Sequence, residues 1–350
     1  MISYLIIGSG YRAEYFGRIA RTYSSLFRAM YLCRSEEKAD KMKEKTGMSA
    51  TVSVQEGMDF QPDFVVVAVD RGHVADVAVE WIERGYAVLT ETPVGDTPEK
   101  LNRLCCMARE GARISCCEQY HRYPFLAAGL KALQDGIIGQ VDSIYLSLLH
   151  DYHAASIIRR ALGIKPGESY IMRGNRNHSA ILETDSRYGA ILDGRKALSD
   201  RDLVHIQFES GKEAVYDFSS VQYRTYIRSR HITVRGDRGE WSDSIILYAD
   251  AQNRPQRLFL LPEIQEKYRI LDNQALRDRR RFWSAEMAMD TNQDEFAIAS
   301  MLLDMGEYLQ GGVSPYPLGE AVEDAWFWIN VMEAVKHPWQ EIRWNGMTDI

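Results

Sequence analysis

The segment from Ile6 to Phe16, IIGSGYRAEYF, has the glycine spacing of a phosphate-binding turn. Gly8 permits a tight turn, Gly10 lets the backbone approach a pyrophosphate, and Ala13 stands where a third glycine commonly packs the helix on the strand. The apolar run before the motif and the helical pattern after it would aim free amides and a positive helix end at the phosphates. The segment predicts a dinucleotide site; the alternative is a glycine turn that binds no ligand.

The end of the next expected strand bears on which dinucleotide binds. NAD-binding proteins usually place a carboxylate about 20 positions beyond the motif, where it holds the adenosine ribose. Here that place is Cys33, followed by Arg34 and Ser35. A guanidinium and a hydroxyl could contact a 2′-phosphate instead. The sequence therefore favours NADP, with NAD as the alternative.

The first third of the chain alternates buried strands with amphipathic helices. Each apolar run is followed by a polar turn and then by a helical pattern. The expected strands cover residues 4–8, 28–33, 64–69, 86–91 and 113–120. This alternation predicts an α/β fold with a doubly wound parallel sheet, in which ligands bind at the carboxyl ends of the strands.

After about residue 122 the pattern changes. Two helical segments are followed by segments that alternate as antiparallel strands do, with a hairpin turn at Gly236–Gly239. We expect a Rossmann domain over 1–122 and a second, α+β domain over 123–350. Residues from about 165 to 200 lack clear periodicity, and we expect a substrate loop or lid there.

The amino-acid composition argues against nucleic acid and membranes as binding partners. The 350 residues carry a formal net charge of −7, which argues against nucleic acid, because a phosphate-binding face usually shows as basic excess. We expect the basic run Arg277–Arg281 to be a solvated helix face. No apolar run reaches the roughly 18 residues that span a bilayer, so no membrane is expected.

The five cysteines are an odd number, which disfavours a disulfide framework and fits a reducing cytoplasm. Four of them form the vicinal pairs Cys105-Cys106 and Cys116-Cys117. The second pair lies in an expected strand, where neighbouring side chains point to opposite faces and cannot easily converge on one ion. We expect buried structural thiols and no metal site.

Taken in order, these segments resemble the Gfo/Idh/MocA family of oxidoreductases along almost the whole chain. The resemblance rests on GSGYRA, EKADKM, VVVAVDRGHVADVAVEWIERGYAVLTETP, YHRYPFL, LQDGIIGQVDSI, HAASIIRRALG, ITVRGDRGEW and EDAWFWINVMEAVKHPWQEIRW. It implies a Rossmann domain followed by a domain with a large, mostly antiparallel open sheet that often serves as a dimer face. A homodimer or homotetramer through that sheet is expected. The resemblance also implies a sugar, inositol or related polyol substrate and bound NAD or NADP.

The family carries Glu-Lys-Pro at the end of a Rossmann strand, and its lysine lies beside the nicotinamide and the reacting hydroxyl. Here the tripeptide is Glu91-Thr92-Pro93. Threonine can donate a hydrogen bond but carries no charge and cannot act as a base at neutral pH. The loss could cost several kcal/mol of transition-state stabilisation, about the scale of one lost oxyanion donor. Relocated cations could offset it; the candidates are Arg122, Arg176 and His121.

The resemblance also implies a proton-exchanging histidine at the start of a helix, a position that His153 takes. An imidazole suits this role because its pKa lies near neutrality. Leu149 stands where the family commonly has an aspartate, and His150 and Asp151 are close alternatives. Asp151 or Tyr152 would orient His153 or the substrate. The alternative for His153 is a helix-capping or buried histidine.

The remaining positions follow from the motif and the resemblance. The expected cofactor contacts are Gly8, Gly10, Tyr11, Arg12, Ala13, Arg34, Ser35, Val69, Asp70, His73, Glu91 and Thr92. The expected catalytic residues are His153, Asp151, Tyr152 and Thr92. The expected substrate contacts are Tyr120, His121, Arg122, Arg176 and His178, and the polar segment 165–190 adds Tyr170, Arg173 and Arg187 as candidates.

The sequence thus predicts an NAD(P)-dependent oxidoreductase that moves a hydride to or from a secondary alcohol or ketone of a sugar or polyol derivative. One alternative is a redox-neutral glycosidase or lyase that oxidises its substrate and then reduces it again with a tightly held cofactor. The other is a non-catalytic sensor of dinucleotide and sugar, which the threonine at position 92 favours.

Overall fold

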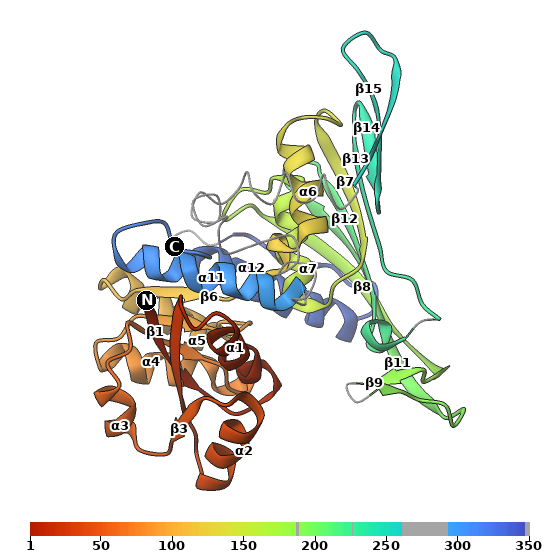
Figure 1. Ribbon diagram of the computed structural model, residues 1–350. Helices are drawn as coiled ribbons and strands as arrows, with labels where there is room; N and C mark the ends of the chain where they lie inside the picture. Colours follow the sequence, from red (N-terminus) through yellow and green to blue (C-terminus); the bar gives the residue numbers. More distant parts are fainter. Residues whose placement is uncertain (187–188, 226, 261–292, 347–350) are drawn as a thin grey trace. The chain divides into compact units, whose positions relative to one another are not determined.

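The computed structural model describes residues 1–186, 189–225, 227–260 and 293–346 (Figure 1). The expected surface run Arg277–Arg281 and the candidate Arg187 lie outside them. The described chain divides into two compact units. The N-terminal unit comprises 1–123 and 293–325, and the C-terminal unit comprises the described residues of 124–260 and 326–346.

The N-terminal unit is built on sheet A, six parallel strands in the order β3-β2-β1-β4-β5-β6. Its strands are β1 Ile2–Ile7, β2 Phe27–Leu32, β3 Ser49–Thr51, β4 Phe64–Val67, β5 Val88–Thr90 and β6 Ile114–Cys116. Their central residues are buried because helices cover both faces. The strand order reverses beside β1, where doubly wound folds bind ligands. The predicted doubly wound sheet is confirmed, with the short edge strand β3 added.

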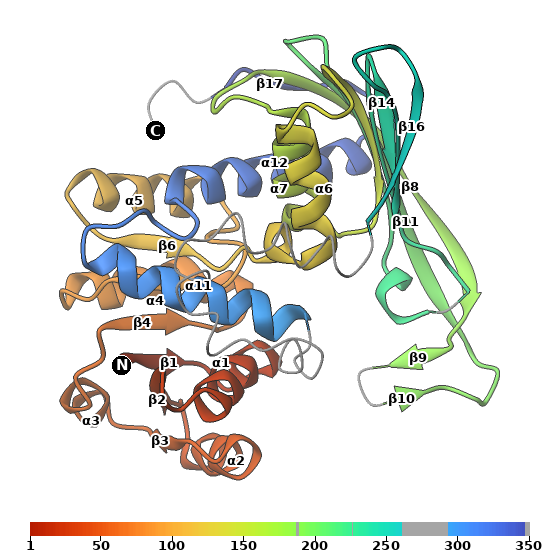
Figure 2. The ribbon, with the colours of Figure 1, turned by 45° about the horizontal axis from the view of Figure 1, so that its top comes forward.

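The helices of this unit are α1 Tyr11–Thr22, α2 Glu36–Thr46, α3 Val54–Asp59, α4 Val74–Glu83, α5 Pro98–Arg109 and α11 Gln293–Leu309, with 3-10 turns η1 Arg71–His73 and η2 Tyr120–Arg122. Ser35, Ser53 and Thr97 cap three of them, and Gly47 ends α2 in the left-handed conformation. Helices α1, α2 and α11 lie on one face of sheet A, and α4 and α5 lie on the other (Figure 2).

Helix α11 lies far beyond residue 122 in the chain but belongs to the N-terminal unit. Gly306 packs so closely on β1 that an added Cβ would lie 2.5 Å from Cδ1 of Ile2. Arg18 on α1 also donates to Glu295 at 2.8 Å. The expected division into 1–122 and 123–350 therefore differs from the observed units in the place of this helix.

The C-terminal unit is built on sheet B, nine strands in the order β16-β15-β14-β13-β7-β12-β11-β8-β17. The strands are β7 Val141–Ser147, β8 Tyr170–Leu182, β11 Lys196–Phe208, β12 Glu213–Ser219, β13 His231–Gly236, β14 Gly239–Ser242, β15 Ile245–Ala249, β16 Pro255–Phe259 and β17 Ile342–Trp344. Only β7 and β12 run parallel; the other pairs are antiparallel. The large, mostly antiparallel sheet and the hairpin at Gly236–Gly239 are confirmed.

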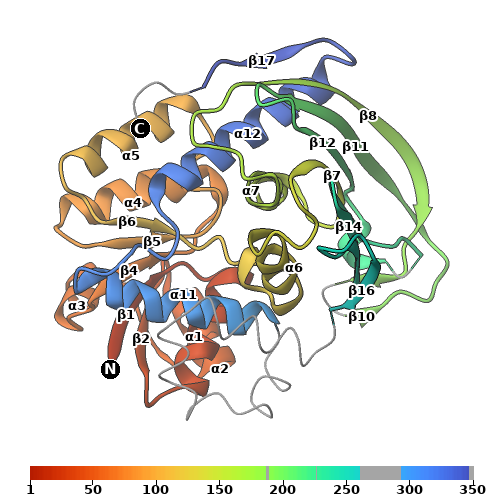
Figure 3. The same cartoon turned by 90° about the horizontal axis from the view of Figure 1, so that it is seen from above.

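Three helices lie on one face of sheet B, namely α6 Pro124–Gln134, α7 Asp151–Leu162 and the part of α12 (Leu318–Lys336) from Trp326 onward (Figure 3). Phe327 of α12 stacks on Phe208 and lies 5.4 Å from the ring of Tyr170. The short pair β9 Asp185–Ser186 and β10 Gly189–Ala190 and the turn η3 Gln222–Arg224 complete the unit.

The expected loop at 165–200 is wrong, because most of it forms β8, the short strands β9 and β10, and the start of β11. Along these strands polar side chains pair across the ladder, so no apolar alternation marks them in the sequence. Arg176 lies opposite Asp202, and His178 lies opposite Asp200. A strand whose polar side chains are satisfied by the neighbouring strand does not need the apolar pattern that we used to find strands.

All five cysteines are free, and Cys33, Cys105, Cys116 and Cys117 are buried. Burial raises the pKa of the Cys116 and Cys117 thiols well above the usual value. Cys106 is exposed on α5, so the expectation of burial is wrong for that thiol. In the described part of the chain, no group of three or more potential ligand side chains could hold a metal, and no helix is long and apolar enough to cross a bilayer.

Candidate active site

The glycine turn after β1 requires Gly8. Its φ is +136°, a conformation that side chains rarely allow, and an added Cβ would lie 2.1 Å from the carbonyl oxygen of Ala68. The turn is thus pressed against the end of β4. This contact fixes where α1 begins relative to the carboxyl edge of sheet A.

Gly10 has a different role. It is the N-cap of α1, has extended backbone, and offers no side-chain acceptor to the first amides of the helix. Among the residues that the structure describes, and apart from its chain neighbours, an added Cβ would meet no heavy atom within 4 Å. Ala13 behind it is fully buried. Free amides at a positive helix end, without a Cβ in front, fit the pyrophosphate of a dinucleotide.

The end of β2 has no carboxylate on Cys33, Arg34 or Ser35. Arg34 and Ser35 are exposed, whereas Cys33 is buried. The Ser35 hydroxyl accepts from the amide of Lys38 at 3.4 Å and so caps α2. Arg34 is therefore the more available of the two for a 2′-phosphate.

The loop after β4 carries Val69, Asp70 and His73. Val69 is half-buried and the other two are exposed. The Asp70 carboxylate accepts from the amide of Gly72 at 3.1 Å and so organises η1. His73 precedes α4, with its Nδ1 at 3.8 Å from Asp70 Oδ1. Both side chains stand at the carboxyl edge of sheet A, as the strand pattern predicted.

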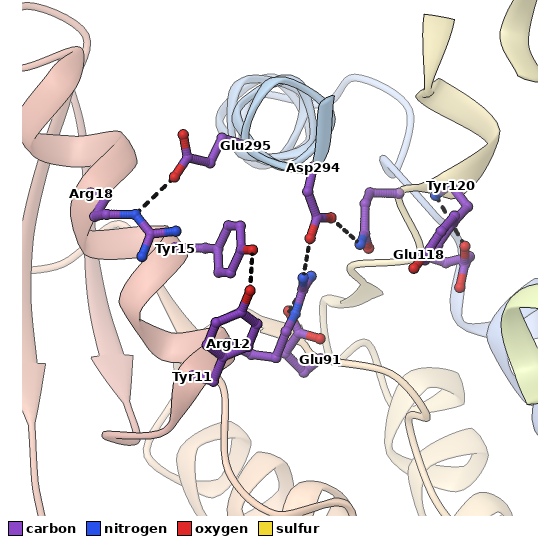
Figure 4. Close-up of polar contacts among 10 residues, drawn as sticks. Tyr11, Arg12, Tyr15, Arg18, Glu91, Glu118, Tyr120, Asp294 and Glu295 are labelled. Carbon is purple, nitrogen blue, oxygen red and sulfur yellow. Dashed lines mark hydrogen bonds and ion pairs between the residues drawn. The ribbon is translucent and has the colours of Figure 1, made fainter. Parts of the chain in front are cut away.

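Arg12 is the centre of an ion-pair cluster at the same edge (Figure 4). Its Nη2 lies 3.1 Å from Oε1 of Glu91, and its Nη1 donates to Oδ2 of Asp294 at 2.6 Å. The other oxygen of Asp294 accepts from Nε2 of Gln119 at 2.7 Å. Burial would lower the pKa of Arg12, but the charges of Glu91 and Asp294 raise it well above the usual value.

Burial raises the pKa of Glu91, whereas the guanidinium of Arg12 and the amide of Thr92 oppose that shift. The sequence analysis selected Arg12 and Glu91 but missed Asp294 and Gln119. Asp294 lies 282 positions from Arg12, and no local motif marks it.

Tyr11 packs beside this cluster. Its hydroxyl lies 2.7 Å from that of Tyr15, one turn further along α1. The guanidinium groups of Arg12 and Arg18 lie 5.1 Å and 4.3 Å from the centre of the Tyr15 ring. These contacts hold both arginines against the first two turns of the helix.

Thr92 is half-buried. Two of the side chains proposed to replace the missing lysine, Arg122 and His121, have partners elsewhere in the N-terminal unit. Arg122, a candidate relocated cation, donates from Nη1 to Asp304 at 2.6 Å and from Nη2 to the carbonyl of Pro315 at 2.9 Å. The ring of His121 lies 5.5 Å from that of Tyr316. These contacts tie η2, with Tyr120 at its start, to α11 and to the segment between α11 and α12, so Arg122 links parts of the N-terminal unit that lie far apart in the chain.

In the C-terminal unit, the start of α7 brings together the residues expected to handle a proton. The rings of His153 and Tyr152 lie 4.6 Å apart, and those of His153 and His150 lie 5.0 Å apart. His150 Nδ1 lies 3.2 Å from Oδ2 of Asp151. His153 is buried, with 7% of its surface exposed. An imidazole among a phenol, a second imidazole and a carboxylate can exchange a proton with a bound hydroxyl.

The backbone of Asp151 is strained. Its φ is +48°, in the left-handed region that non-glycine residues rarely adopt. Its amide donates to the hydroxyl of Tyr216 at 3.1 Å, and the amide of His150 donates to that of Tyr223 at 3.3 Å. Two tyrosines of the sheet-B side thus fix the first residues of α7.

Arg176 on β8 forms a two-point ion pair with Asp202 on β11, with distances of 2.6 Å and 2.8 Å. Hydrogen bonding to Asp202 raises the pKa of Arg176, and the charge of Asp151 adds to that shift. His178 pairs with Asp200 at 2.7 Å. The structure therefore assembles two groups, each within its own unit: Arg12, Glu91, Asp294 and Gln119 in the first, and Asp151, Tyr152, His153 and Arg176 in the second.

Comparison with known proteins gives the class first. Residues 2–118 match the model of a family described as "Oxidoreductase family, NAD-binding Rossmann fold". Residues 2–118 are therefore similar to the Rossmann domain of that family, Gfo/Idh/MocA, and over this part of the chain the match agrees with the resemblance seen in the sequence. A search among curated proteins found no match.

Solved structures extend the similarity in fold to the whole chain. Levoglucosan dehydrogenase in complex with NADH and levoglucosan is 15% identical, covers 100% of both chains and has a TM-score of 0.71. A putative myo-inositol dehydrogenase from Sinorhizobium meliloti 1021 is 15% identical, covers 98% of this chain and 99% of its own, and scores 0.65. An oxidoreductase from Agrobacterium radiobacter in complex with NAD⁺, L-tartaric acid and magnesium is 11% identical, covers 97% and 98%, and scores 0.70.

Proposed function

We propose that this protein is an NAD(P)-dependent dehydrogenase or reductase of a sugar or polyol derivative. The glycine turn carries the proposal, because Gly8 and Gly10 present uncapped helix amides within a domain that matches an NAD-binding oxidoreductase family. Residues 1–122 would bind the dinucleotide, and 123–350 would bind substrate. Levoglucosan in one structure of the same fold supports a carbohydrate substrate.

The contacts to the cofactor follow from the placement of each residue. The amides at Gly10, Tyr11, Arg12 and Ala13 would hold the pyrophosphate, and Arg34 with Ser35 would meet the adenosine ribose. The exposed guanidinium of Arg34 favours NADP, with NAD as the alternative that the NADH and NAD⁺ complexes of the same fold support. The ratio of the two dissociation constants measures this preference. The remaining contacts would come from Val69, Asp70, His73, Glu91 and Thr92.

When bound, the dinucleotide supplies the group that accepts or delivers a hydride at a secondary carbinol carbon. The protein would move the accompanying proton. His153 would exchange it with the substrate hydroxyl, because a buried imidazole beside Tyr152 and close to Asp151 can accept and return a proton near neutral pH. Thr92 could only donate a hydrogen bond to that oxygen.

The substrate would meet polar groups that can both donate and accept. The Arg176–Asp202 pair offers guanidinium donors and carboxylate acceptors side by side, and His178–Asp200 continues that stripe along β8 and β11. Such mixed pairs suit hydroxyl groups better than they suit a single strong charge. Tyr120 and His121 remain candidate contacts, whereas Arg122 would act mainly by holding η2 in place.

The test is His153→Asn, which keeps a hydrogen-bonding side chain but removes the titrating group. We expect turnover to fall by about a thousandfold, the scale of general acid–base catalysis, with dinucleotide affinity unchanged. The control is His205→Asn on β11, where the half-exposed ring lies 3.5 Å from Glu213. Undiminished turnover in the first variant would remove His153 from the role.

The uncharged side chain at position 92 favours two further candidates. A redox-neutral enzyme would oxidise and then reduce its substrate, so product would form without accumulated NADH. A non-catalytic sensor would bind dinucleotide and sugar but turn over neither. Product analysis with NADH detection separates the three, and restored activity in Thr92→Lys would indicate an inactive descendant of a dehydrogenase.

We extend the proposal to the oligomeric state of the protein and to its cellular compartment. All three described helices of the C-terminal unit lie on one face of sheet B, and Tyr145 on the opposite face is 38% exposed. We propose that this opposite face forms a homodimer or homotetramer, which the molar mass in solution measures. The five free thiols fit a reducing cytoplasm.

A further inference from the structure

The burial of His153 creates a requirement that His153 alone does not meet. Only 7% of its surface is exposed. A base that takes a proton from a hydroxyl in each reaction cycle must pass that proton to solvent before it can act again. A second titrating group, close to His153 and in contact with water, would meet this requirement.

His150, the N-cap residue of α7, has both properties. Its ring centre lies 5.0 Å from that of His153, and the two ring planes are nearly perpendicular, at 79°. Its side chain is 31% exposed. Imidazoles this close can exchange a proton directly when their nitrogens approach, or through one water molecule. His150 therefore connects the buried imidazole with solvent.

Asp151 orients the ring of His150. Its Oδ2 lies 3.2 Å from Nδ1 of His150. An aspartate is ordinarily ionised at neutral pH, so this contact favours a hydrogen on Nδ1 and leaves Nε2 as the nitrogen that accepts a proton. The Asp151 side chain is itself 27% exposed, so water can reach the same pair.

The strained backbone of Asp151 is a second, independent observation on this pair. The φ of +48° brings the carboxylate beside the ring of the preceding residue. The hydroxyl of Tyr216 accepts from the amide of Asp151 at 3.1 Å, and that of Tyr223 accepts from the amide of His150 at 3.3 Å. Strain of this kind persists only where surrounding contacts hold it, and it is concentrated at functional sites.

Other titratable groups near the pair are poorer proton carriers. Tyr152, Tyr216 and Tyr223 are phenols, whose ordinary pKa is about 10, and burial raises the pKa of Tyr216 well above that value. Arg176 and Asp202 pair with each other at 2.6 Å and 2.8 Å. An imidazole accepts and releases protons near neutral pH more readily than any of these groups.

We propose that His150 carries the proton between His153 and solvent, with Asp151 holding its ring in place. In alcohol oxidation, His153 would take the hydroxyl proton and pass it to Nε2 of His150. His150 would then release the proton on Nδ1 to water beside Asp151, and exchange with water would restore the starting tautomer. One proton thus moves from substrate to solvent in each cycle, and ketone reduction would use the same path in reverse. The inference rests on the proposed function, because that function gives His153 a proton to exchange.

The test needs neither dinucleotide nor substrate. In protein labelled with isotopic histidine, NMR measures how fast the ring N–H proton of His153 exchanges with water, and the signal lost in His153→Asn assigns it. His150→Phe keeps a ring that cannot carry a proton, and we expect the exchange to slow about tenfold or more. His150→Gln is smaller and can still hydrogen-bond to Asp151 but does not titrate, so we expect a similar slowing. The second variant carries the test where the first does not fold.

The matched control is a second histidine–aspartate pair on sheet B. Nδ1 of His231 on β13 lies 2.9 Å from Oδ2 of Asp243, and Asp243 also has a φ of +48°. His231→Phe therefore removes an imidazole from a similar local structure, and we expect it to leave the exchange at His153 unchanged.

Three results would contradict the relay. The first is exchange at the wild-type rate in both His150 variants. The second is slowing in His150→Phe alone, which would show that the bulk of the ring matters and not its proton transfer. The third is equal slowing in His231→Phe, which would mean that the effect is not local. Absence of dinucleotide binding by wild type would instead overturn the proposed function and leave the exchange measurement intact.

Discussion

The carboxyl edge of sheet A and the helix-covered face of sheet B build polar sites in different ways. At the edge of sheet A, a backbone contact between Gly8 and Ala68 sets the geometry, and carboxylates from the end of β5 and from α11 then converge on Arg12 of α1. On sheet B, ion pairs lie directly opposite each other on two adjacent strands. The first site thus depends on a close approach of the backbone, and the second depends on strand register.

The largest expected effect in this comparison is the loss of folding stability when Gly8 is replaced by alanine. In Gly8→Ala the new methyl group would lie 2.1 Å from the oxygen of Ala68, at a φ of +136°. Because the neighbouring atom is backbone at the end of a buried strand, it cannot move aside cheaply. We expect a loss of about 3–5 kcal/mol in the free energy of unfolding, measured by urea denaturation.

Gly10→Ala is the matched control for that experiment. Its methyl group would meet no atom of the described residues within 4 Å beyond its chain neighbours, so we expect the unfolding free energy to change by about 1 kcal/mol or less, the cost of alanine at an N-cap. A similar loss of stability in both variants would contradict the view that the contact with Ala68 sets the turn.

A smaller effect is expected on sheet B, where Asp202 and Asp200 lie two residues apart on β11. Asp202→Asn leaves Arg176, which is only 28% exposed, without its carboxylate, and we expect a loss of about 2 kcal/mol in unfolding free energy. Asp200→Asn breaks an exposed pair with His178, for which we expect about 0.5 kcal/mol or less. Thermal and urea unfolding of both variants measure the difference. Equal effects would contradict the view that burial makes the Arg176–Asp202 pair the more stabilising of the two.

These two regions also differ in how far the sequence predicted them. The spacing of Gly8, Gly10 and Ala13 after an apolar run was enough to predict the turn, the helix and the parallel sheet, because each signal is local. The alternating pattern after residue 122 indicated antiparallel strands, and the resemblance added that they form one large open sheet and pointed to His153. The sequence also predicted that Arg12 and Glu91 lie at one edge, since the carboxyl ends of parallel strands meet there.

What the sequence missed depends on contacts between distant segments. Asp294 joins the Arg12 cluster across 282 positions, and no local spacing encodes that pairing. The segment around Arg176 looked like a loop because its polar residues are satisfied by β11 and not by solvent. The left-handed backbone of Asp151 depends on tyrosines from β12 and from the turn after it, so a helix pattern alone could not predict it.

The smallest expected effect concerns the other face of sheet B and appears only in acid. Burial alone would raise the pKa of Asp217, but hydrogen bonds from Arg201 and Tyr145 outweigh it and hold the pKa below the usual value. A carboxylate with a lowered pKa in the folded state adds stability above the pKa of the unfolded chain, about 3.9, and loses it as the pH falls through the folded-state value.

The contribution is about 1 kcal/mol or less, because Arg201 is half-exposed and solvent screens the pair. The unfolding free energies of wild type and Asp217→Asn should therefore differ at neutral pH and converge as the pH falls through the folded-state pKa of Asp217. Asp142→Asn, at an exposed side chain near the start of β7, should run parallel to wild type throughout. If the difference in unfolding free energy between wild type and Asp217→Asn stays the same at every pH, packing and not charge stabilises that face. Stabilising ion pairs would then be confined to the face of sheet B that α7 covers.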